Sequence, residues 1–133
     1  WLSNFYPAEV IYAGKKFATV EHAYQAAKCA NVGDMQAIQM IEKPGDAKRF
    51  GKSVTKQVDW DDAKKVTIML ELLRQKFAIS ELQEKLLATG NKELQEGNYW
   101  KDTFWGVDLL SNKGQNILGQ LIMQVRSEIR GEG

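Results

Sequence analysis

The most informative segment of this chain reads Thr19-Val20-Glu21-His22-Ala23-Tyr24-Gln25-Ala26-Ala27-Lys28. At ~100° per residue, a helix through this segment gathers four different polar groups on one narrow stripe: Glu21, Tyr24, Gln25 and Lys28. Alanines at positions 23, 26, 27 and 30 fill the opposite side. The segment therefore predicts a helix, capped by Thr19, that packs through its alanines and leaves a carboxylate, a phenol, an amide and an amine pointing together.

The polar stripe has two interpretations. It is either a surface that faces a substrate or an ordinary solvent-exposed helix face. In the second case, Glu21 with Gln25 and Tyr24 with Lys28 form pairs at (i, i+4) spacing. The segment taken alone favours neither interpretation.

The flanking sequence predicts an α+β fold, mainly helical, with a short N-terminal β-hairpin and a small sheet. Residues 9–12 and 15–18 read as the hairpin strands, and Gly14 supplies the positive φ of a tight turn. Two short helices are expected at about 34–41, closed by Pro44-Gly45, and at 46–50. A longer helix is expected from an Asp59 cap along the apolar positions Val66, Met69, Leu70, Leu73 and Phe77. Two more are expected from a Ser80/Gln83 capping box to Gly90 and along Leu118, Leu121, Ile122, Val125 and Ile129.

Length and charge limit the classes of protein. The 133 residues predict one domain spanning 1–133, and the start at Trp1 rather than methionine suggests that residues upstream are missing. With 18 basic and 17 acidic side chains, the net charge of +1 provides no global field for nucleic acid or an anionic membrane. Any recognition of phosphate must therefore be local.

Cysteine and histidine are too scarce for a disulfide or a common metal site. Cys29 is the only cysteine and His22 the only histidine, so we expect no internal disulfide, no metal and no cofactor. A reducing cytoplasm fits this usage best. No apolar run approaches ~18 residues, so neither a membrane span nor a membrane partner is expected.

The segment Trp100-Lys101-Asp102-Thr103-Phe104-Trp105-Gly106 is too aromatic for an ordinary solvated turn. It predicts a pocket wall that carries a carboxylate and ends in a glycine. The alternative is that Trp100 and Trp105 close the end of a helical core and that Asp102 serves as a turn or capping residue. Both interpretations stay open.

Four segments resemble the NADAR domain family in their content and order. They are Leu2-Ser3-Asn4-Phe5-Tyr6-Pro7, Val20-Glu21-His22-Ala23-Tyr24-Gln25-Ala26-Ala27-Lys28, Asp102-Thr103-Phe104-Trp105-Gly106 and Gly114-Gln115-Asn116-Ile117-Leu118-Gly119. The resemblance extends from Leu2 to Arg126, and ordered blocks at domain-wide spacing are specific. The chain departs from the family pattern at Ala23 and Ala27, where bulkier residues are common, and at Asp108, which leaves open whether Asp102 or Asp108 is the acting aspartate.

The resemblance implies N-glycosidase chemistry on ribosyl phosphates, which the family carries out in two branches. One branch removes ADP-ribose from guanine bases modified by toxins, and the other cleaves early phosphoribosyl intermediates of riboflavin biosynthesis. The first is preferred here, because an aromatic wall suits a stacked base and a compact domain fits a toxin-antagonist or phage role. A non-catalytic ADP-ribose or NAD-binding module and, less favoured, a DNA-binding structural protein are the alternatives.

The catalytic candidates follow from the chemistry of a ribose C1–N bond. Cleavage needs stabilised positive charge at C1 and a protonated leaving nitrogen, tasks that suit Glu21 and Asp102. Lys28 offers a second route, because a neutral amine can attack C1 of the ring-opened sugar and form an imine that water hydrolyses. That route requires a pKa well below the ordinary value of about 10.4 for lysine.

The remaining candidates would bind the substrate. Tyr24 and Gln25 are assigned to the ribose hydroxyls, Trp105 or Trp60 to the base, and Lys48 and Arg49, with Lys52 beside Gly51, to the phosphates or else to a solvated helix end. Asn4 either binds substrate or fixes the N-terminal loop, and Phe5 and Gly106 complete the set. The expected partner is ADP-ribosylated single-stranded DNA, with its base flipped out, or a small ribosyl phosphate. The sequence does not indicate an oligomeric state.

Overall fold

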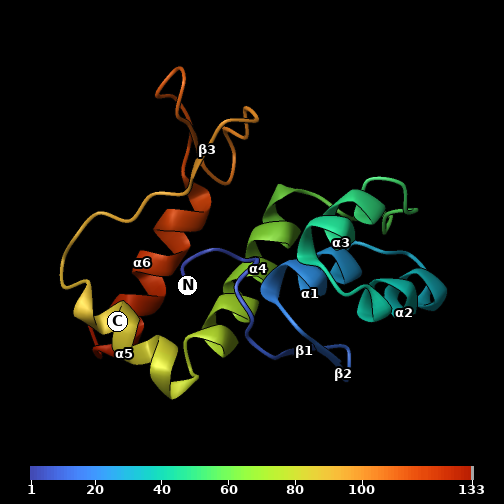
Figure 1. The fold of residues 1–133 in the computed structure, drawn as a ribbon, viewed down its shortest axis with the longest axis horizontal. Coiled ribbons are helices and arrows are strands. Elements are labelled where there is room, and N and C mark those ends of the chain that lie inside the picture. Colours follow the sequence, from blue (N-terminus) through green and yellow to red (C-terminus); the bar gives the residue numbers. More distant parts are fainter. Residues whose placement is uncertain (133) are drawn as a thin grey trace. The chain divides into compact units, whose positions relative to one another are not determined.

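The computed structural model describes residues 1–132 and shows an α+β chain that is mainly helical (Figure 1). The fold class predicted from the sequence is confirmed. The chain divides into two compact units, one from Trp1 to Ile79 and one that begins at Ser80, so a single domain over the whole chain stays a prediction. Within residues 1–132, no helix has the length and apolar character needed to cross a bilayer.

The N-terminal unit opens with the predicted hairpin. Strand β1 (Val10–Tyr12) pairs antiparallel with β2 (Lys15–Phe17). Gly14 has the expected positive φ of 75°, and Ala13 before it also has a positive φ, of 50°. Two positive φ values in a two-residue loop match the right-handed twist of the strands. Gln75 then binds the exposed edge of β1, accepting from the Ile11 N–H at 2.7 Å and donating to its carbonyl at 2.8 Å.

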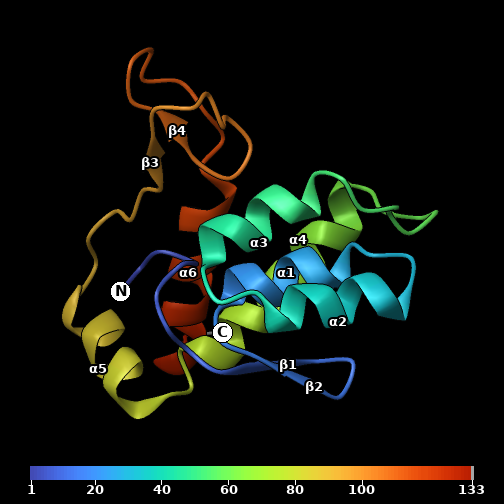
Figure 2. The ribbon, with the colours of Figure 1, turned by 45° about the vertical axis from the view of Figure 1, so that its right-hand side comes forward.

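Helix α1 (Val20–Ala27) contacts helices α2 (Val32–Met40), α3 (Pro44–Gly51) and α4 (Asp62–Lys76), as Figure 2 shows. Thr19 caps it as predicted, its side chain accepting from the His22 backbone N–H. All eight residues of α1 are buried. The interpretation of its polar stripe as a solvent-exposed face is therefore wrong. The helix also ends one residue earlier than Lys28, so Ala30 lies beyond its packing face.

The boundary between α2 and α3 differs from the prediction. Asn31 caps α2 by accepting from the Asp34 backbone N–H at 2.8 Å, so the helix starts before residue 34. Pro44 begins α3 rather than closing α2, because a residue without an N–H suits the first turn of a helix, where that N–H has no partner. The His22 ring connects α1 to the end of α2, because its Nε2 donates to the carbonyl of Ile41, the C-cap of α2, at 2.8 Å.

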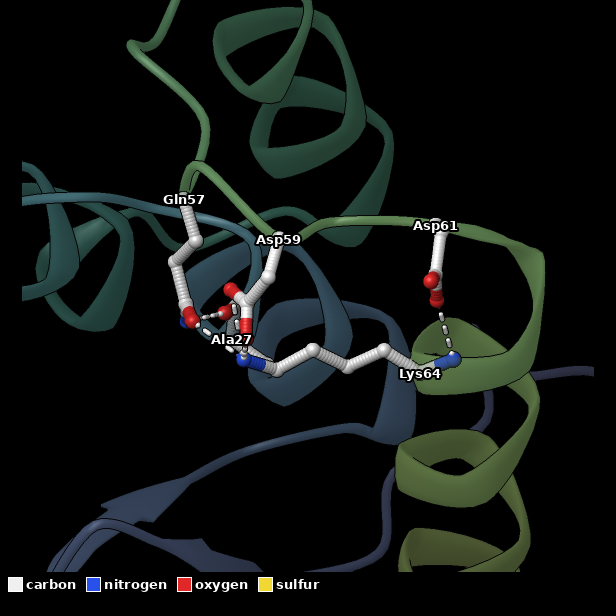
Figure 3. A network of polar contacts seen from close by, with 5 residues as sticks. All are labelled: Ala27, Gln57, Asp59, Asp61 and Lys64. Carbon is white, nitrogen blue, oxygen red and sulfur yellow. Dashed lines mark hydrogen bonds and ion pairs between the residues drawn. The ribbon is translucent and has the colours of Figure 1, made fainter.

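The sequence predicts the N-cap of α4 two residues too early. Asp61, and not Asp59, accepts from the Lys64 backbone N–H, whereas Asp59 binds the Lys64 ammonium at 2.8 Å (Figure 3). An aspartate caps only from the position just before the first helical residue, which Asp61 occupies. The buried side of α4 includes Met69, Leu72, Leu73, Lys76 and the following Phe77, while Val66 and Leu70 are half-buried.

Gly51 at the end of α3 gives a test of how tightly this helix packs on α1. A Cβ at this position would lie 1.9 Å from Oε1 of the buried Gln25 side chain. We expect Gly51→Ala to lower the free energy of unfolding by about 1–3 kcal/mol. Gly45→Ala in the same helix is the matched control, because its Cβ would meet only the Phe5 ring at 3.9 Å. Denaturant unfolding of both variants measures the difference, and equal stability would contradict the close contact.

The second unit contains helices α5 (Ser80–Ala88) and α6 (Ile117–Ile129) and a parallel pair, β3 (Gly97–Asn98) with β4 (Val107–Asp108). The predicted stripe of α6 is confirmed, since Leu118, Leu121, Ile122 and Val125 are buried and Ile129 is half-buried. The β3 and β4 loops lie near the first turn of α6 (Figure 1). Arg126 is buried in this unit and donates to the Thr89 hydroxyl at 2.8 Å.

Candidate functional site

A buried acid and amide form the centre of the polar stripe on α1. Glu21 is only 7% exposed, and Gln25 is 4% exposed. Gln25 Nε2 donates to Glu21 Oε1 at 2.8 Å, the (i, i+4) pair that the sequence predicts. The pair therefore exists, but in the protein interior, where a carboxylate is costly unless a function or a partner requires it.

Burial raises the pKa of Glu21 above its ordinary value. The Gln25 hydrogen bond opposes this effect, followed by the positive charges of Lys48 and Lys28. Burial is the largest influence because it penalises the charged form. A carboxyl group that holds its proton closer to neutral pH is suited to act as a general acid.

Lys28 follows α1 as its C-terminal cap and is half-buried. Burial is the main cause that lowers its pKa, and Lys56 and Lys65 lower it further, against the opposing charge of Glu21. The ammonium lies 5.9 Å from the centroid of the Tyr24 ring. Burial thus raises the pKa of the acid and lowers that of the amine, the directions in which enzymes shift a catalytic glutamate and a catalytic lysine.

A loop of residues 52–61 closes over the end of α1 and fixes the Lys28 backbone. The Gln57 N–H donates to the Lys28 carbonyl at 2.9 Å, and the Ala30 N–H donates to the Thr55 carbonyl at 2.8 Å. The Gln57 side chain also donates to the Ala27 carbonyl and accepts from Lys64 at 2.8 Å (Figure 3). The loop, held in turn by Lys64 of α4, therefore sets the position of the Lys28 backbone.

The same loop brings an aromatic residue to the stripe. The Trp60 ring is half-buried, and its centroid lies 5.7 Å from that of Tyr24 with the ring planes tilted by 56°. Both residues are candidates from the sequence, but they are 36 positions apart, and only the folded loop brings them together. Their rings give the polar stripe an aromatic neighbour of the kind that stacks on a base.

The cations nearest the stripe differ in part from the predicted set. Lys48 is half-buried and its charge acts on Glu21, whereas Arg49 is exposed and paired with Asp46. Lys52 is exposed at the end of α3. Sequence reasoning missed Lys56 and Lys65, whose charges act on Lys28. Lys56 lies in the loop of residues 52–61 and Lys65 in α4, so only the tertiary fold brings their charges near Lys28.

Asn4 links the N-terminal segment to the start of α1. Its carbonyl accepts from the Glu21 backbone N–H at 3.1 Å, and its Nδ2 lies 3.6 Å from the Met69 sulfur. Its Oδ1 is buried without a hydrogen-bond partner among the described residues, as is Oε1 of Gln25. A buried unpaired acceptor costs about 1–3 kcal/mol, so the Asn4 oxygen is suited to receive a donor from a ligand, whereas the Gln25 oxygen packs against Gly51. Phe5, which follows Asn4, is 41% exposed.

In the second unit, Asp102 has a structural role. Its Oδ1 accepts from the backbone N–H groups of Phe104 at 3.1 Å and Trp105 at 3.0 Å, the geometry of a turn residue. Trp105 is half-buried and meets the Phe104 ring edge to face at 4.9 Å. A Cβ at Gly106 would lie 2.3 Å from the Glu96 carbonyl oxygen, so this position requires glycine. A catalytic role for Asp102 stays a prediction.

Asp108, the other candidate for the acting aspartate, is buried and hydrogen-bonded within its own loop. It is 6% exposed, and its carboxylate accepts from the Leu110 N–H at 3.2 Å and the Ser111 hydroxyl at 2.8 Å. Trp100 is 62% exposed. Across residues 1–132, no cluster of three or more His, Cys, Asp or Glu side chains is arranged to hold a metal ion.

Asn98, which is not among the residues predicted from the sequence, organises this aromatic segment. Its Nδ2 donates to the carbonyls of Asp102 at 2.9 Å and Val107 at 3.3 Å, and its Oδ1 accepts from the N–H groups of Trp100 and Asp102. The residue is 2% exposed. An Asn followed by a turn-forming aromatic segment is the signal that could have indicated it.

Removal of the Asn98 side chain is expected to destabilise this unit. Asn98→Ala leaves several buried backbone groups unpaired, so we expect a loss of about 2–4 kcal/mol in the free energy of unfolding. Gln95→Ala, at an exposed position three residues earlier, should change it by less than about 0.5 kcal/mol. Denaturant unfolding followed by tryptophan fluorescence compares them, and similar curves for both variants would show that the Asn98 bonds contribute little.

Comparisons with known proteins agree on one family. The NADAR domain family model matches residues 1–130. N-glycosidase Npun_R5314 of Nostoc punctiforme is 40% identical, with 96% of this chain and 84% of that protein covered. N-glycosidase YbiA of Escherichia coli is 34% identical, over 96% of this chain and 79% of that protein. The NMR structure of E. coli YbiA superposes with a TM-score of 0.85 at 33% identity, covering 98% of this chain and 78% of that one.

A longer relative adds a different context. Riboflavin biosynthesis protein VVA0006 of Vibrio vulnificus is 35% identical over 98% of this chain. The chain spans only 35% of the length of that protein. The name of the Vibrio protein therefore describes a polypeptide of which this chain resembles about one third.

Proposed function

Because the chain belongs to the NADAR domain family, we propose that it is an N-glycosidase that cleaves the bond between ribose C1 and a nitrogen. The relatives that it covers most fully are named N-glycosidases, which supports glycosidase chemistry. The observation that carries the proposal is the pairing of a buried acid on α1, Glu21, whose pKa is raised, with the amine that caps the same helix, Lys28, whose pKa is lowered.

The proposed reaction assigns one task to each group. Glu21 delivers a proton to the ring oxygen as the sugar ring opens, and the neutral Lys28 amine forms a bond to C1. A proton released by the attacking amine moves to the leaving nitrogen, and the C1–N bond to the base breaks and leaves an imine between C1 and Nζ. Water adds to this imine, its hydrolysis frees the amine and the ribosyl product, and closure of the sugar ring returns the proton to Glu21. Direct hydrolysis with Glu21 and Asp102 as the two carboxyl groups is the alternative route.

The preferred substrate is ADP-ribosylated guanine in DNA. The Trp60 ring, which lies against Tyr24 of the stripe, would stack on a base, and Lys48, Lys56 and Lys65 would bind phosphates. The target base would have to be single-stranded or flipped out of the helix. We further propose that the protein acts in the cytoplasm, as a toxin antagonist of bacterial or phage origin.

Two alternatives have their own support. The name of the Vibrio relative favours phosphoribosyl intermediates of riboflavin biosynthesis as substrates. A non-catalytic module that binds ADP-ribose or NAD would use the same rings and lysines but would not require the pKa of Glu21 and that of Lys28 to be shifted toward each other. A binder would retain affinity for ADP-ribose and show no turnover.

The deciding experiment follows product release from two substrates. The wild-type protein is mixed with guanine-ADP-ribosylated single-stranded DNA and, separately, with phosphoribosylaminopyrimidine intermediates. Faster release of ADP-ribose supports the guanine branch, and faster cleavage of the pyrimidine intermediates transfers the proposal to the riboflavin branch. If the protein cleaves neither substrate but calorimetry detects binding of ADP-ribose, the proposed function changes from an enzyme to a binding module.

A further inference from the structure

The buried ammonium of Lys76, in the last turn of α4, takes no part in the chemistry proposed above. The residue is 0% exposed. Its Nζ donates to the Ser3 carbonyl at 2.8 Å and lies 6.0 Å from the Tyr6 ring centroid and 5.3 Å from that of Phe77. Lysine is almost never fully buried, because its ammonium must leave water. A charge kept at such a position suggests that its contacts serve a purpose.

The carbonyl that receives Lys76 belongs to a compact turn of residues 3–6. The Ser3 carbonyl also accepts from the Tyr6 N–H at 3.1 Å, and the Ser3 hydroxyl accepts from the Phe5 N–H at 3.0 Å. The Tyr6 ring lies within range of the same ammonium. Lys76 therefore fastens both ends of this turn to α4.

The turn reaches the candidate site through Asn4, the residue that it encloses. The Asn4 carbonyl accepts from the Glu21 N–H in the first turn of α1, and the Asn4 Nδ2 contacts Met69 of α4. The residue is 9% exposed, and its Oδ1 is one of two buried side-chain atoms without a hydrogen-bond partner among the described residues. An oxygen held in this way can only accept, so the group that completes it must carry a hydroxyl or amine donor.

We propose that Lys76 is a positioning residue, which holds the turn of residues 3–6 against α4 so that the Asn4 side-chain oxygen can accept a hydrogen bond from a hydroxyl or amine of the substrate. The last step rests on the proposed function, since it requires an N-ribosyl substrate. The first step, the fastening of the turn, does not. The two steps are therefore tested separately.

The fastening is tested in the ligand-free protein by hydrogen exchange. Lys76→Met keeps the length of the side chain and removes the charge, and Lys92→Met, at an exposed position, is the matched control. We expect the Tyr6 and Phe5 amides to exchange on the order of tenfold faster in Lys76→Met and unchanged in the control. Unchanged exchange in Lys76→Met would overturn the proposal. If this variant does not fold, Lys76→Gln, which is uncharged and one atom shorter, takes its place; faster exchange of the same two amides is again expected, and unchanged exchange would overturn the proposal.

The link to Asn4 is tested by a double-mutant cycle on whichever substrate the wild type cleaves. We expect Lys76→Met and Asn4→Ala each to raise KM by about tenfold, with kcat changed less than about threefold. The double variant should be no worse than Asn4→Ala alone, because Lys76 acts through Asn4. Additive effects, or a loss confined to kcat, would overturn the link. If the wild type cleaves no N-ribosyl substrate, the proposed function fails, and hydrogen exchange still decides the role of Lys76.

Discussion

Lys28→Met is expected to lower kcat for C1–N cleavage by at least about 10³-fold while the protein remains folded. The amine is the proposed nucleophile, and its pKa is lowered by burial and by Lys56 and Lys65, which makes the neutral, nucleophilic form easier to reach than in an ordinary lysine. Methionine keeps the length of the side chain but cannot attack C1. The matched control is Lys43→Met, at an exposed position at the start of α3, which should retain nearly full activity.

Trapping the intermediate separates the imine route from direct hydrolysis. Borohydride added during turnover should reduce the imine and leave a stable adduct on the peptide that contains Lys28, detected by mass spectrometry. Lys28→Met should give no adduct. If the wild type turns over without any adduct, the imine route is excluded, and Glu21 with Asp102 would remain as the acid–base pair.

The pH dependence of unfolding tests whether the Lys28 pKa is in fact lowered. The folded pKa lies below the unfolded one, so between these two values the unfolded state binds more protons. The free energy of unfolding of the wild type should therefore rise, relative to that of Lys28→Met, as pH increases from the folded pKa toward about 10.4. A difference that does not change with pH would mean that Lys28 is solvated as an ordinary surface lysine.

The residues of the polar stripe could be named from the sequence, but not their environment. Helical periodicity places Glu21, Gln25 and Lys28 on one side of α1 whatever surrounds it. Whether that side is exposed to solvent or buried depends on α3 and on the loop of residues 52–61. Both pack against α1 although they are distant from it in the sequence. The prediction therefore identified the groups and left the solvent-exposed interpretation open until the packing was known.

Local signals also failed where two neighbouring residues could do the same task. Asp59 and Asp61 are equally good capping residues, and only the actual first turn of α4 selects Asp61. Lys76 would be expected to extend into water from the end of a helix, yet it is fully buried against the N-terminal turn. A lysine binding the carbonyl of a residue 73 positions away leaves no pattern in a sequence.

Glu21→Gln is expected to reduce kcat by about 10²- to 10⁴-fold and, at neutral pH, to make the protein more stable. The loss of activity follows from removing the proposed general acid. The gain in stability follows from burial, which is the largest cause of the raised Glu21 pKa and penalises the carboxylate in the folded protein. Glutamine has the same shape and no charge, and its amide can still bind Gln25.

The sign of the stability change depends on pH in a defined way. The folded pKa of Glu21 lies above the unfolded one, so between them the folded state binds more protons and wild-type stability falls as pH rises. The advantage of Glu21→Gln should therefore be absent below about pH 4, grow through the interval between the two pKa values and then stay constant. Glu71→Gln, at an exposed position on α4, should show no such change. The measurement is denaturant unfolding at a series of pH values.

The two effects of Glu21→Gln are most informative together. A residue kept for structure alone should destabilise the fold when replaced, whereas one kept for catalysis can relieve a cost when replaced, because active sites retain groups that the fold would not choose. An inactive and more stable variant would therefore identify Glu21 as a functional acid. An inactive variant that is less stable at pH 7 would mean that the Gln25 bond and the charges of Lys48 and Lys28 outweigh burial, and that the carboxylate is the favoured form in the folded protein.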